Sequence, residues 1–299
     1  MDIDLSFSQA AVVMPVEYNT LRFIVVGAGG TGSFVVPAIA RLIYELKQQQ
    51  NKSAEMLIVD PDVVESGNIP RSNFCFAEVG RYKAQTLAER VSTAWGIQTS
   101  FSCEWFDAEK HLKSSTSDYR SLTIIVGCVD NHMARREMHR ALDEFRSYGD
   151  ASRVWWIDGG NGKASGQVLL GSTTKPLKPE QCFTGTSICR ALPAPSLQHP
   201  DLLQPERVKS NSGASCPERV RLGQQGLNVN QRVAIEIAEM LLSMLLTTSL
   251  KRFATYFDLE SGTSRSLYCL LSEPKLSRTL FKARADRIKK IESRTCGME

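Results

Sequence analysis

The sequence predicts a doubly wound α/β fold, a Rossmann-like, mostly parallel sheet with antiparallel additions toward the C-terminus. Three observations indicate this class. Short apolar segments typical of strands alternate with segments whose apolar residues recur at helical spacing. A glycine-rich turn at 27–33, Gly-Ala-Gly-Gly-Thr-Gly-Ser, follows the first such strand. Residues 122–128 form a continuous apolar run, which is typical of a parallel strand covered on both faces.

The expected elements follow from these patterns in chain order. The apolar run at 23–26 predicts the first strand, and apolar side chains at helical spacing predict a helix over 31–48. The same two patterns predict the next elements: a strand at 56–59, a helix at 83–94, strands at 99–106 and 122–128, a helix at 131–145, and strands at 154–157 and 166–168. A strongly apolar helix then spans 228–246, and segments 251–258 and 265–271 form a hairpin around the turn at 260–263.

Composition excludes several classes of protein. The net charge of +4 is mild, so we do not expect a nucleic-acid partner, and the basic tail at 282–290 is expected to be a solvated helix. No secretory leader precedes the chain's first strand, and no apolar stretch reaches the roughly 18 residues of a membrane span. We therefore expect a cytoplasmic protein without a membrane partner. Its eight cysteines lack short paired spacings, which indicates thiols and no structural zinc site.

Polar residues after the first two strands predict a nucleotide site. The glycine turn lets a helix N-terminus face a phosphate. A dehydrogenase needs one acidic residue after its second strand, and Asp60 would suffice for that role. Asp62, Asn68 and Arg71 follow within a dozen residues, and such a set indicates a pocket for a whole triphosphate and its metal.

Five ordered motifs between residues 22 and 170 resemble those of the ThiF/MoeB/HesA adenylyltransferases, relatives of the ubiquitin-activating enzymes. They are the glycine turn, Asp-x-Asp-x-Val with Asn-x-x-Arg at 60–71, Gly-x-x-Lys-Ala at 80–84, Asp-Asn-x-x-x-Arg at 130–135, and a glycine pair with a Gly-x-Val strand at 159–168. The segment 216–231 also resembles the ThiF-like proteins of the PRTRC type, found in bacterial mobile-element gene clusters.

This resemblance implies an enzyme that binds ATP and magnesium and activates a carboxylate as an acyl-adenylate. Arg71 and Lys83 would hold the phosphates, and Asp130 would hold magnesium. Asp60 would take the ribose hydroxyls, Asp62 would support the loop or the metal, and Asn68 would bond near the phosphates. The expected nucleotide-contacting glycines are Gly27, Gly29, Gly30 and Gly32. Arg135 leaves two interpretations open, a site residue or helix surface.

The resemblance also implies partners. The substrate would be the C-terminal carboxylate of a small ubiquitin-like or sulfur-carrier protein ending in Gly-Gly, with thioester or thiocarboxylate transfer as a possible later step. Cys216 ranks first as the nucleophile, with Cys182 and Cys189 as alternatives in the same segment. A homodimer is expected from the family and from the apolar residues 233–242. No arginine precedes Arg22, so an arginine contributed to a partner's site would come from elsewhere.

The chain is expected to form a single domain over 1–299, with three parts. Residues 22–171 form the nucleotide-binding half, 172–227 a proline-rich crossing loop, and 228–299 the C-terminal helix, hairpin and basic tail. Two alternative functions stay open: an NAD-dependent oxidoreductase on the same nucleotide fold, and a ThiF-like scaffold without turnover.

Overall fold

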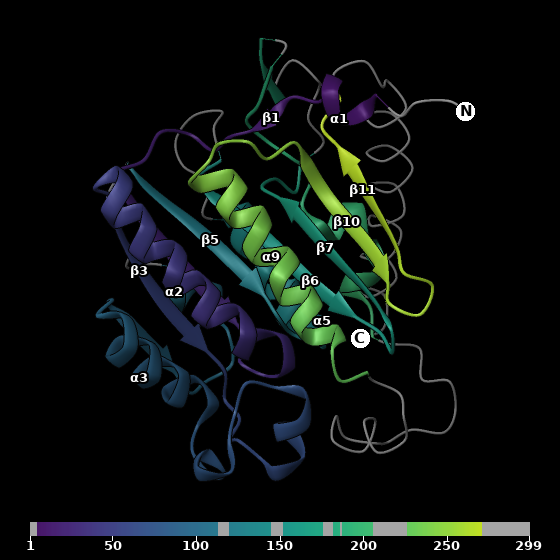
Figure 1. Cartoon of the computed structure of the whole chain (residues 1–299). Coiled ribbons are helices and arrows are strands. Elements are labelled where there is room, and N and C mark those ends of the chain that lie inside the picture. Colours follow the sequence, from purple (N-terminus) through teal and green to yellow (C-terminus); the bar gives the residue numbers. More distant parts are fainter. Residues whose placement is uncertain are drawn as a thin grey trace, which may run out of the picture.

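The computed structural model describes residues 5–112, 120–144, 152–175, 182–185, 187–205 and 226–270. In these ranges the main sheet has eight strands, in the order β11-β10-β7-β6-β5-β2-β3-β4 (Figure 1). The strands are β2 (Thr20–Val26), β3 (Ser53–Val59), β4 (Thr99–Ser102), β5 (Ser121–Gly127), β6 (Val154–Asn161), β7 (Ser165–Gly171), β10 (Arg252–Asp258) and β11 (Thr263–Tyr268).

The half of the sheet from β6 to β4 is parallel, and its register aligns the carboxyl ends of three strands. Val26 lies beside Val59 on one side and Gly127 on the other. The chain reverses its winding between β2 and β5, because β3 and β4 continue outward from one side of β2 while β5 and β6 continue from the other. Ligands of doubly wound sheets bind at such a switch point, beyond the carboxyl ends of the strands.

The antiparallel half begins at β7, which pairs with β6, and continues through β10 and β11. The predicted mostly parallel sheet with antiparallel C-terminal additions is therefore confirmed, and the first antiparallel strand precedes the crossing loop. The hairpin at the C-terminal side is confirmed as β10 and β11.

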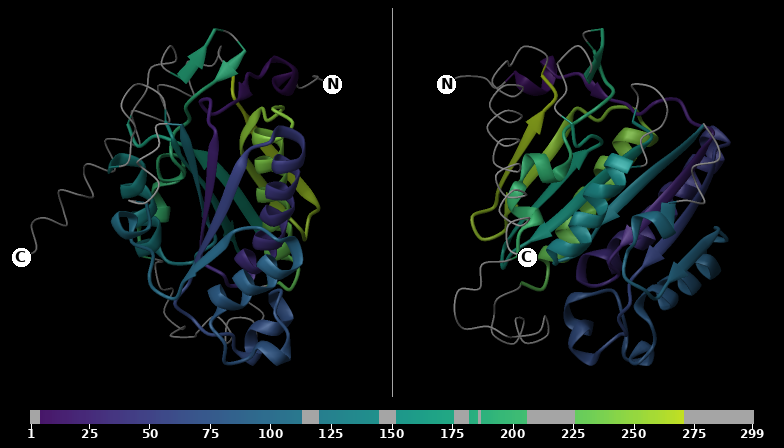
Figure 2. Two further views of the ribbon diagram at one scale, coloured as in Figure 1. Left: turned by 90° about the vertical axis from the view of Figure 1, so that its left-hand side faces the viewer. Right: turned by 180° about the vertical axis from the view of Figure 1, so that it is seen from behind.

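Helices cover both faces of the sheet (Figure 2). On one face α2 (Gly30–Gln50), α3 (Lys83–Trp95) and α9 (Val229–Leu245) pack over a core that includes Phe23 and Trp155. On the other face α4 (Ala108–Leu112), α5 (His132–Glu144) and α7 (Pro195–Gln198) pack over a core that includes Trp156. Short 3-10 helices complete this part of the chain: η1 (Ser66–Arg71), η2 (Phe76–Glu78) and η4 (Pro200–Leu203).

One expected element boundary was wrong. The strand predicted at 99–106 leaves the sheet at Ser102. The crossing loop is more regular than its prolines indicate, since its described part contains β8 (Phe183–Thr184), β9 (Ile188–Cys189), α7 and η4. Strand β9 pairs with β1 (Val12–Val13), which follows α1 (Ser6–Gln9) near the N-terminus. The basic tail at 282–290 lies outside the described residues.

None of the helices in the described part of the chain has the length and apolar character needed to cross a membrane.

Candidate active site

The glycine turn lies at the switch point between β2 and β5. Its first residue donates a backbone hydrogen bond to the Val59 carbonyl at 2.9 Å, which holds the turn against β3. Gly27 has φ +91°, and a Cβ there would lie 2.7 Å from the Cys128 carbonyl oxygen, so only glycine fits between these strand ends. Gly29 has open space around its Cα and faces the pocket, whereas Gly32 packs under the turn and does not line it.

Asp60 follows β3 and ties the glycine turn to the second strand. One carboxylate oxygen accepts the Ala28 N–H at 2.6 Å, and the other accepts the Asp62 N–H at 2.8 Å. The residue is 6% exposed, and burial raises the pKa of its carboxyl above the ordinary value, against the opposing charge of Lys83 and these two N–H donors. Asp60 thus lines the pocket in a fixed orientation.

Lys83 lies beside the segment that follows β3, because backbone pairing joins residues about twenty positions apart in the sequence. Val63 bridges Tyr82, and the Lys83 N–H donates to the Asp62 carbonyl at 2.9 Å. The Lys83 ammonium also contacts the Asp62 carboxylate at 2.9 Å. The Lys83 side chain is 10% exposed and the Asp62 side chain is 61% exposed. Asp62 therefore contacts the buried Lys83 from the solvent side of the pocket.

Asn68 and Arg71 belong to η1, which lies beside the same pocket. The Asn68 amide oxygen accepts the Glu65 N–H at 3.1 Å and so caps this short helix. Arg71 is the last residue of η1 and is 7% exposed. Both residues line the pocket, and the capped helix fixes the backbone position from which the Arg71 side chain extends.

Asp130 closes the opposite edge of the pocket, just beyond β5. Its neighbour Asn131 accepts the Ala134 N–H at 2.8 Å and caps α5, which fixes the turn that carries Asp130. The Asp130 carboxylate is exposed.

One pocket therefore brings together nine of the predicted residues; we call it the glycine-turn pocket. Those nine are Gly27, Gly29, Gly30, Asp60, Asp62, Asn68, Arg71, Lys83 and Asp130. Buried cations and an acidic rim around a helix N-terminus form an arrangement suited to a polyphosphate.

A comparison with protein-family models finds a match to the ThiF family over residues 16–194, more than half of the chain. The chain belongs to the ThiF family. Its fold is similar to that of PaaA, with a TM-score of 0.52 and 13% identity over 83% of this chain and 64% of PaaA. It is also similar to Escherichia coli MccB crystallised with MccA-N7isoASN, with a TM-score of 0.50 and 13% identity over 83% of this chain and 64% of MccB.

These structural relatives are longer than this chain, which spans about two thirds of their length. A search of curated protein sequences finds no match. The resemblance to the ThiF family predicted from the five motifs is thus confirmed, and the PRTRC subgroup stays a prediction.

Arg135 of this ThiF family member is a buried residue, so the helix-surface interpretation was wrong. Its Nε contacts both carboxylate oxygens of Asp158, at 3.3 and 3.2 Å. Asp158 is fully buried on β6, and burial raises the pKa of its carboxyl while the Arg135 charge opposes that rise. The ion pair joins α5, which carries the arginine of the Asp-Asn-x-x-x-Arg motif, to β6 just before the glycine pair.

Three groups of pocket residues were missed in the sequence. Glu104, Trp105 and Phe106 line the pocket because the chain leaves the sheet at Ser102. Asn161 and Asn230 line it from β6 and α9. The asparagines around the start of α9 were the available signal, since a polar residue at the first turn of an apolar helix needs a partner.

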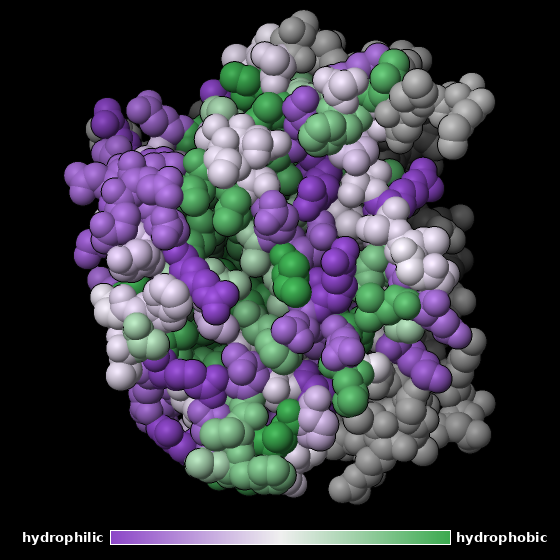
Figure 3. Space-filling model, viewed as in Figure 1, coloured by the Kyte–Doolittle hydropathy of each residue, from purple (hydrophilic) through white to green (hydrophobic). Residues whose placement is uncertain are grey.

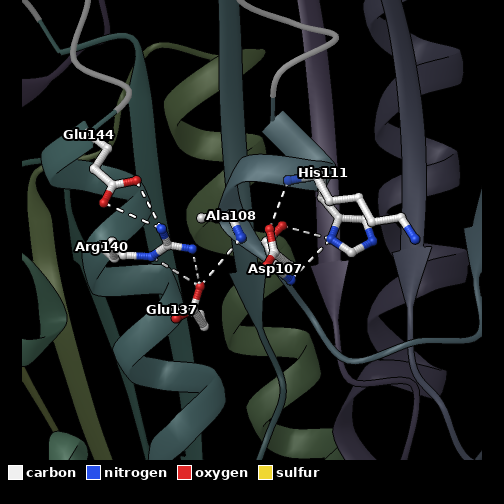
Figure 4. A network of polar contacts seen from close by, with 7 residues as sticks. Asp107, Ala108, His111, Glu137, Arg140 and Glu144 are labelled. Atoms are coloured by element: carbon white, nitrogen blue, oxygen red, sulfur yellow. Dashed lines mark hydrogen bonds and ion pairs between the residues drawn. The ribbon is translucent and has the colours of Figure 1, made fainter.

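A network of polar contacts behind this region holds the segment after Phe106 (Figure 4). The Asp107 N–H and carbonyl both lie within hydrogen-bond distance of His111 Nδ1, at 3.1 and 2.8 Å. Glu137 on α5 accepts from the Ala108 N–H at 3.5 Å and pairs with Arg140. These contacts anchor α4 to α5, next to the pocket wall.

A second hollow adjoins the pocket over β6, β7 and β10; we call it the adjoining hollow. The two share Val129, Asp130 and Asn161. Its lining includes three glycines, Gly160, Gly162 and Gly166, together with larger side chains such as Gln167 and Phe257. The hollow therefore extends from Asp130 over the antiparallel half of the sheet.

The candidate cysteines divide into two groups. Cys182 and Cys189 are buried, and neither lines the pocket or the adjoining hollow. Cys189 lies on β9 of the small sheet formed with β1, and Cys182 directly precedes β8 of that sheet. The small sheet lies at the end of the main sheet opposite the carboxyl ends of the parallel strands (Figure 1). Cys216 lies outside the described residues.

Proposed function

We propose that this ThiF family member is an ATP-dependent adenylyltransferase that activates a substrate carboxylate. The observation that carries the proposal is the charge arrangement around the glycine-turn pocket. Two buried cations, Arg71 and Lys83, line the side of η1 and α3, while the Asp130 carboxylate lines the opposite edge. A nicotinamide dinucleotide needs no such pair of cations and no second acidic edge.

Electrostatics explain why this arrangement suits adenylation. A substrate carboxylate oxygen attacks the α-phosphorus, and the bond from that phosphorus to the bridging oxygen breaks, so pyrophosphate leaves. Because an anion attacks a polyanion, fixed cations make the largest contribution to lowering the free-energy barrier for this attack. Lys83 is held for this task by the Asp62 contact at 2.9 Å, and Arg71 by the capped η1 helix.

Asp130 is the residue that would hold magnesium. Magnesium prefers oxygen ligands and is commonly bound by one or two carboxylates together with substrate phosphates, so the exposed Asp130 carboxylate at the pocket edge fits it. When bound, the ion offsets the negative charge of the phosphates. Asp60 then remains for the ribose hydroxyls, although two N–H donors already occupy part of its acceptor capacity.

The substrate we propose is the tail of a small ubiquitin-like or sulfur-carrier protein that ends in Gly-Gly. The adjoining hollow supports this choice because three glycines belong to its lining and Asp130 lines both the hollow and the glycine-turn pocket. A tail without side chains can lie against such a surface and place its carboxylate at the pocket. As a further part of this proposal, the Cys216 thiolate attacks the acyl carbon of the adenylate, and the bond from that carbon to the AMP phosphate oxygen breaks, so a thioester forms and AMP leaves.

We also propose a homodimer formed through α2 and α9. A furrow between these helices is lined by apolar side chains, among them Phe34, Ala234 and Leu242, and Ile235 is 54% exposed there. Figure 3 shows apolar surface gathered in this furrow. A second copy of the chain would cover it.

The experiment that tests the function follows the α-phosphate of ATP. The protein is incubated with ATP labelled at the α-phosphate and with carrier proteins that end in Gly-Gly, and the nucleotides are separated. We expect the label in the carrier adenylate and, once water or a thiol displaces the nucleotide from it, in AMP; a matched carrier without its last glycine should give at least tenfold less of both. Formation of ADP instead would show cleavage at the γ-phosphate and would overturn the proposal.

A further inference from the structure

Asn230 is a buried amide at the start of α9, and the site as described gives it no role. Its exposed fraction is 0%, although it lines the glycine-turn pocket. A buried amide costs free energy unless its donors and acceptor are bonded. The partners of this side chain therefore explain why an asparagine is tolerated there.

Those partners come from three different segments of the site. The Asn230 Nδ2 donates to the Arg71 carbonyl at 3.1 Å, at the end of η1. Its Oδ1 accepts from the Thr31 hydroxyl at 3.4 Å, in the first turn of α2. The same oxygen accepts from the Asn161 amide at the end of β6.

The amide also rests on the glycine turn itself. A Cβ at Gly30 would lie 2.3 Å from the Asn230 Nδ2, which is far closer than any real contact allows. The side chain therefore fills the space that a larger residue at Gly30 would need. Both its polar contacts and its packing fix the glycine turn relative to η1.

We infer that Asn230 is a positioning residue for nucleotide binding, acting through Arg71 and the glycine turn. It sets the distance between Arg71 and the N-terminus of α2. These two groups would bind opposite sides of the phosphates. It also bonds Asn161, one of the three residues that line both the pocket and the adjoining hollow. The inference rests on the proposed function, because the group positioned is the triphosphate of ATP.

Calorimetric titration of the full chain with MgATP tests this role without the protein substrate. We expect Asn230→Ala to raise the Kd for MgATP at least tenfold. The matched control is Gln198→Ala, because Gln198 is a buried amide that donates to two carbonyls at 2.8 Å and lines neither the pocket nor the hollow. This control should lower the melting temperature by a similar amount and keep the Kd within twofold.

A double-mutant cycle with Arg71→Ala separates positioning from general loss of structure. If Asn230 acts through Arg71, the double variant should raise the Kd by clearly less than the product of the two single effects. Should Asn230→Ala fail to fold, Asn230→Leu replaces it, since this change keeps the branched shape of the side chain and removes its hydrogen bonds without adding a charge.

Two results would overturn the inference while leaving the proposed function intact. One is a wild-type protein that binds MgATP together with an Asn230 variant whose Kd stays within twofold of it. The other is a double variant whose effect equals the product of the single effects. A wild-type protein that does not bind MgATP at all would instead refute the proposed function, and the inference with it.

Discussion

The buried ion pair between Arg135 and Asp158 gives a quantitative prediction. Replacing Arg135 by methionine keeps most of the apolar volume of the side chain and leaves the fully buried Asp158 carboxylate without its cation. Breaking a buried pair from one side costs about 3–5 kcal/mol. At about 2.1 cal/mol/K of unfolding entropy per residue, a chain of 299 residues should then lose roughly 5–8 °C in melting temperature.

The assay is thermal unfolding followed by circular dichroism at pH 7.5, with an exposed ion pair as control. Arg140 pairs with Glu137 at 2.7 Å and with Glu144 at 3.2 Å, and its side chain is 37% exposed (Figure 4). Exposed pairs of this kind contribute about 0–1 kcal/mol, so Arg140→Met should shift the melting temperature by less than about 2 °C. Arg135→Met/Asp158→Asn should recover part of the loss, because it removes the unpaired charge.

The deficit of Arg135→Met should also depend on pH. Burial raises the pKa of Asp158, and loss of the guanidinium raises that pKa further. A carboxyl whose pKa is higher in the folded state destabilises the fold at high pH, and this cost fades as pH falls toward the unfolded pKa of about 3.9. The loss in melting temperature should therefore be larger at pH 8 than at pH 5. A variant as stable as Arg140→Met at both pH values would refute this reasoning.

Four further variants test the site and the surfaces. Asp130→Ala should lower carrier-dependent AMP formation more than hundredfold while the melting temperature stays within about 2 °C, because this carboxylate is exposed; undiminished AMP formation would remove it from the site. Lys83→Ala should lower kcat/KM in the same assay by a factor that corresponds to a loss of about 2–4 kcal/mol of transition-state stabilisation. A fall in kcat/KM of less than twofold would contradict its role. Ile235→Glu should convert a dimer to a monomer in light scattering, unless the wild type is already monomeric, which would reject the dimer. Cys216→Ser should abolish a thiol-sensitive carrier adduct that Cys189→Ser retains, since the latter thiol is buried away from the pocket, and the reverse pattern would exclude Cys216.

Strong periodic patterns made most of the fold predictable. The long helix after the glycine turn and the parallel strands at its sides have apolar runs that fit only one kind of element. The boundary after β4 was missed because residues 103–106 keep a strand-like composition while they turn away to line the pocket. The short strand β9 was missed because its pairing with β1 joins segments far apart in the sequence, which no local pattern encodes.

Site residues that lie within one sequence motif were predictable. Site residues that come together from distant segments of the chain were less so. Asp60 follows β3, Arg71 lies eleven residues later in the same motif and Lys83 begins α3, so their position near a sheet edge could be inferred from spacing. Asn230 lies 159 positions beyond the carbonyl it binds, and only the packing of α9 beside α2 brings the two together. The sequence likewise left Arg135 ambiguous, since Arg135 lies on α5 and its partner Asp158 lies on β6, 23 residues further along the chain.

The central claim is that the glycine-turn pocket takes ATP. Calorimetric titration of one preparation of the full chain with MgATP and then with NAD tests it most directly. We predict saturable, one-site binding of MgATP that Lys83→Ala weakens at least tenfold, with no heat of binding from NAD. Saturable binding of NAD together with no binding of MgATP would contradict the account and establish the oxidoreductase alternative.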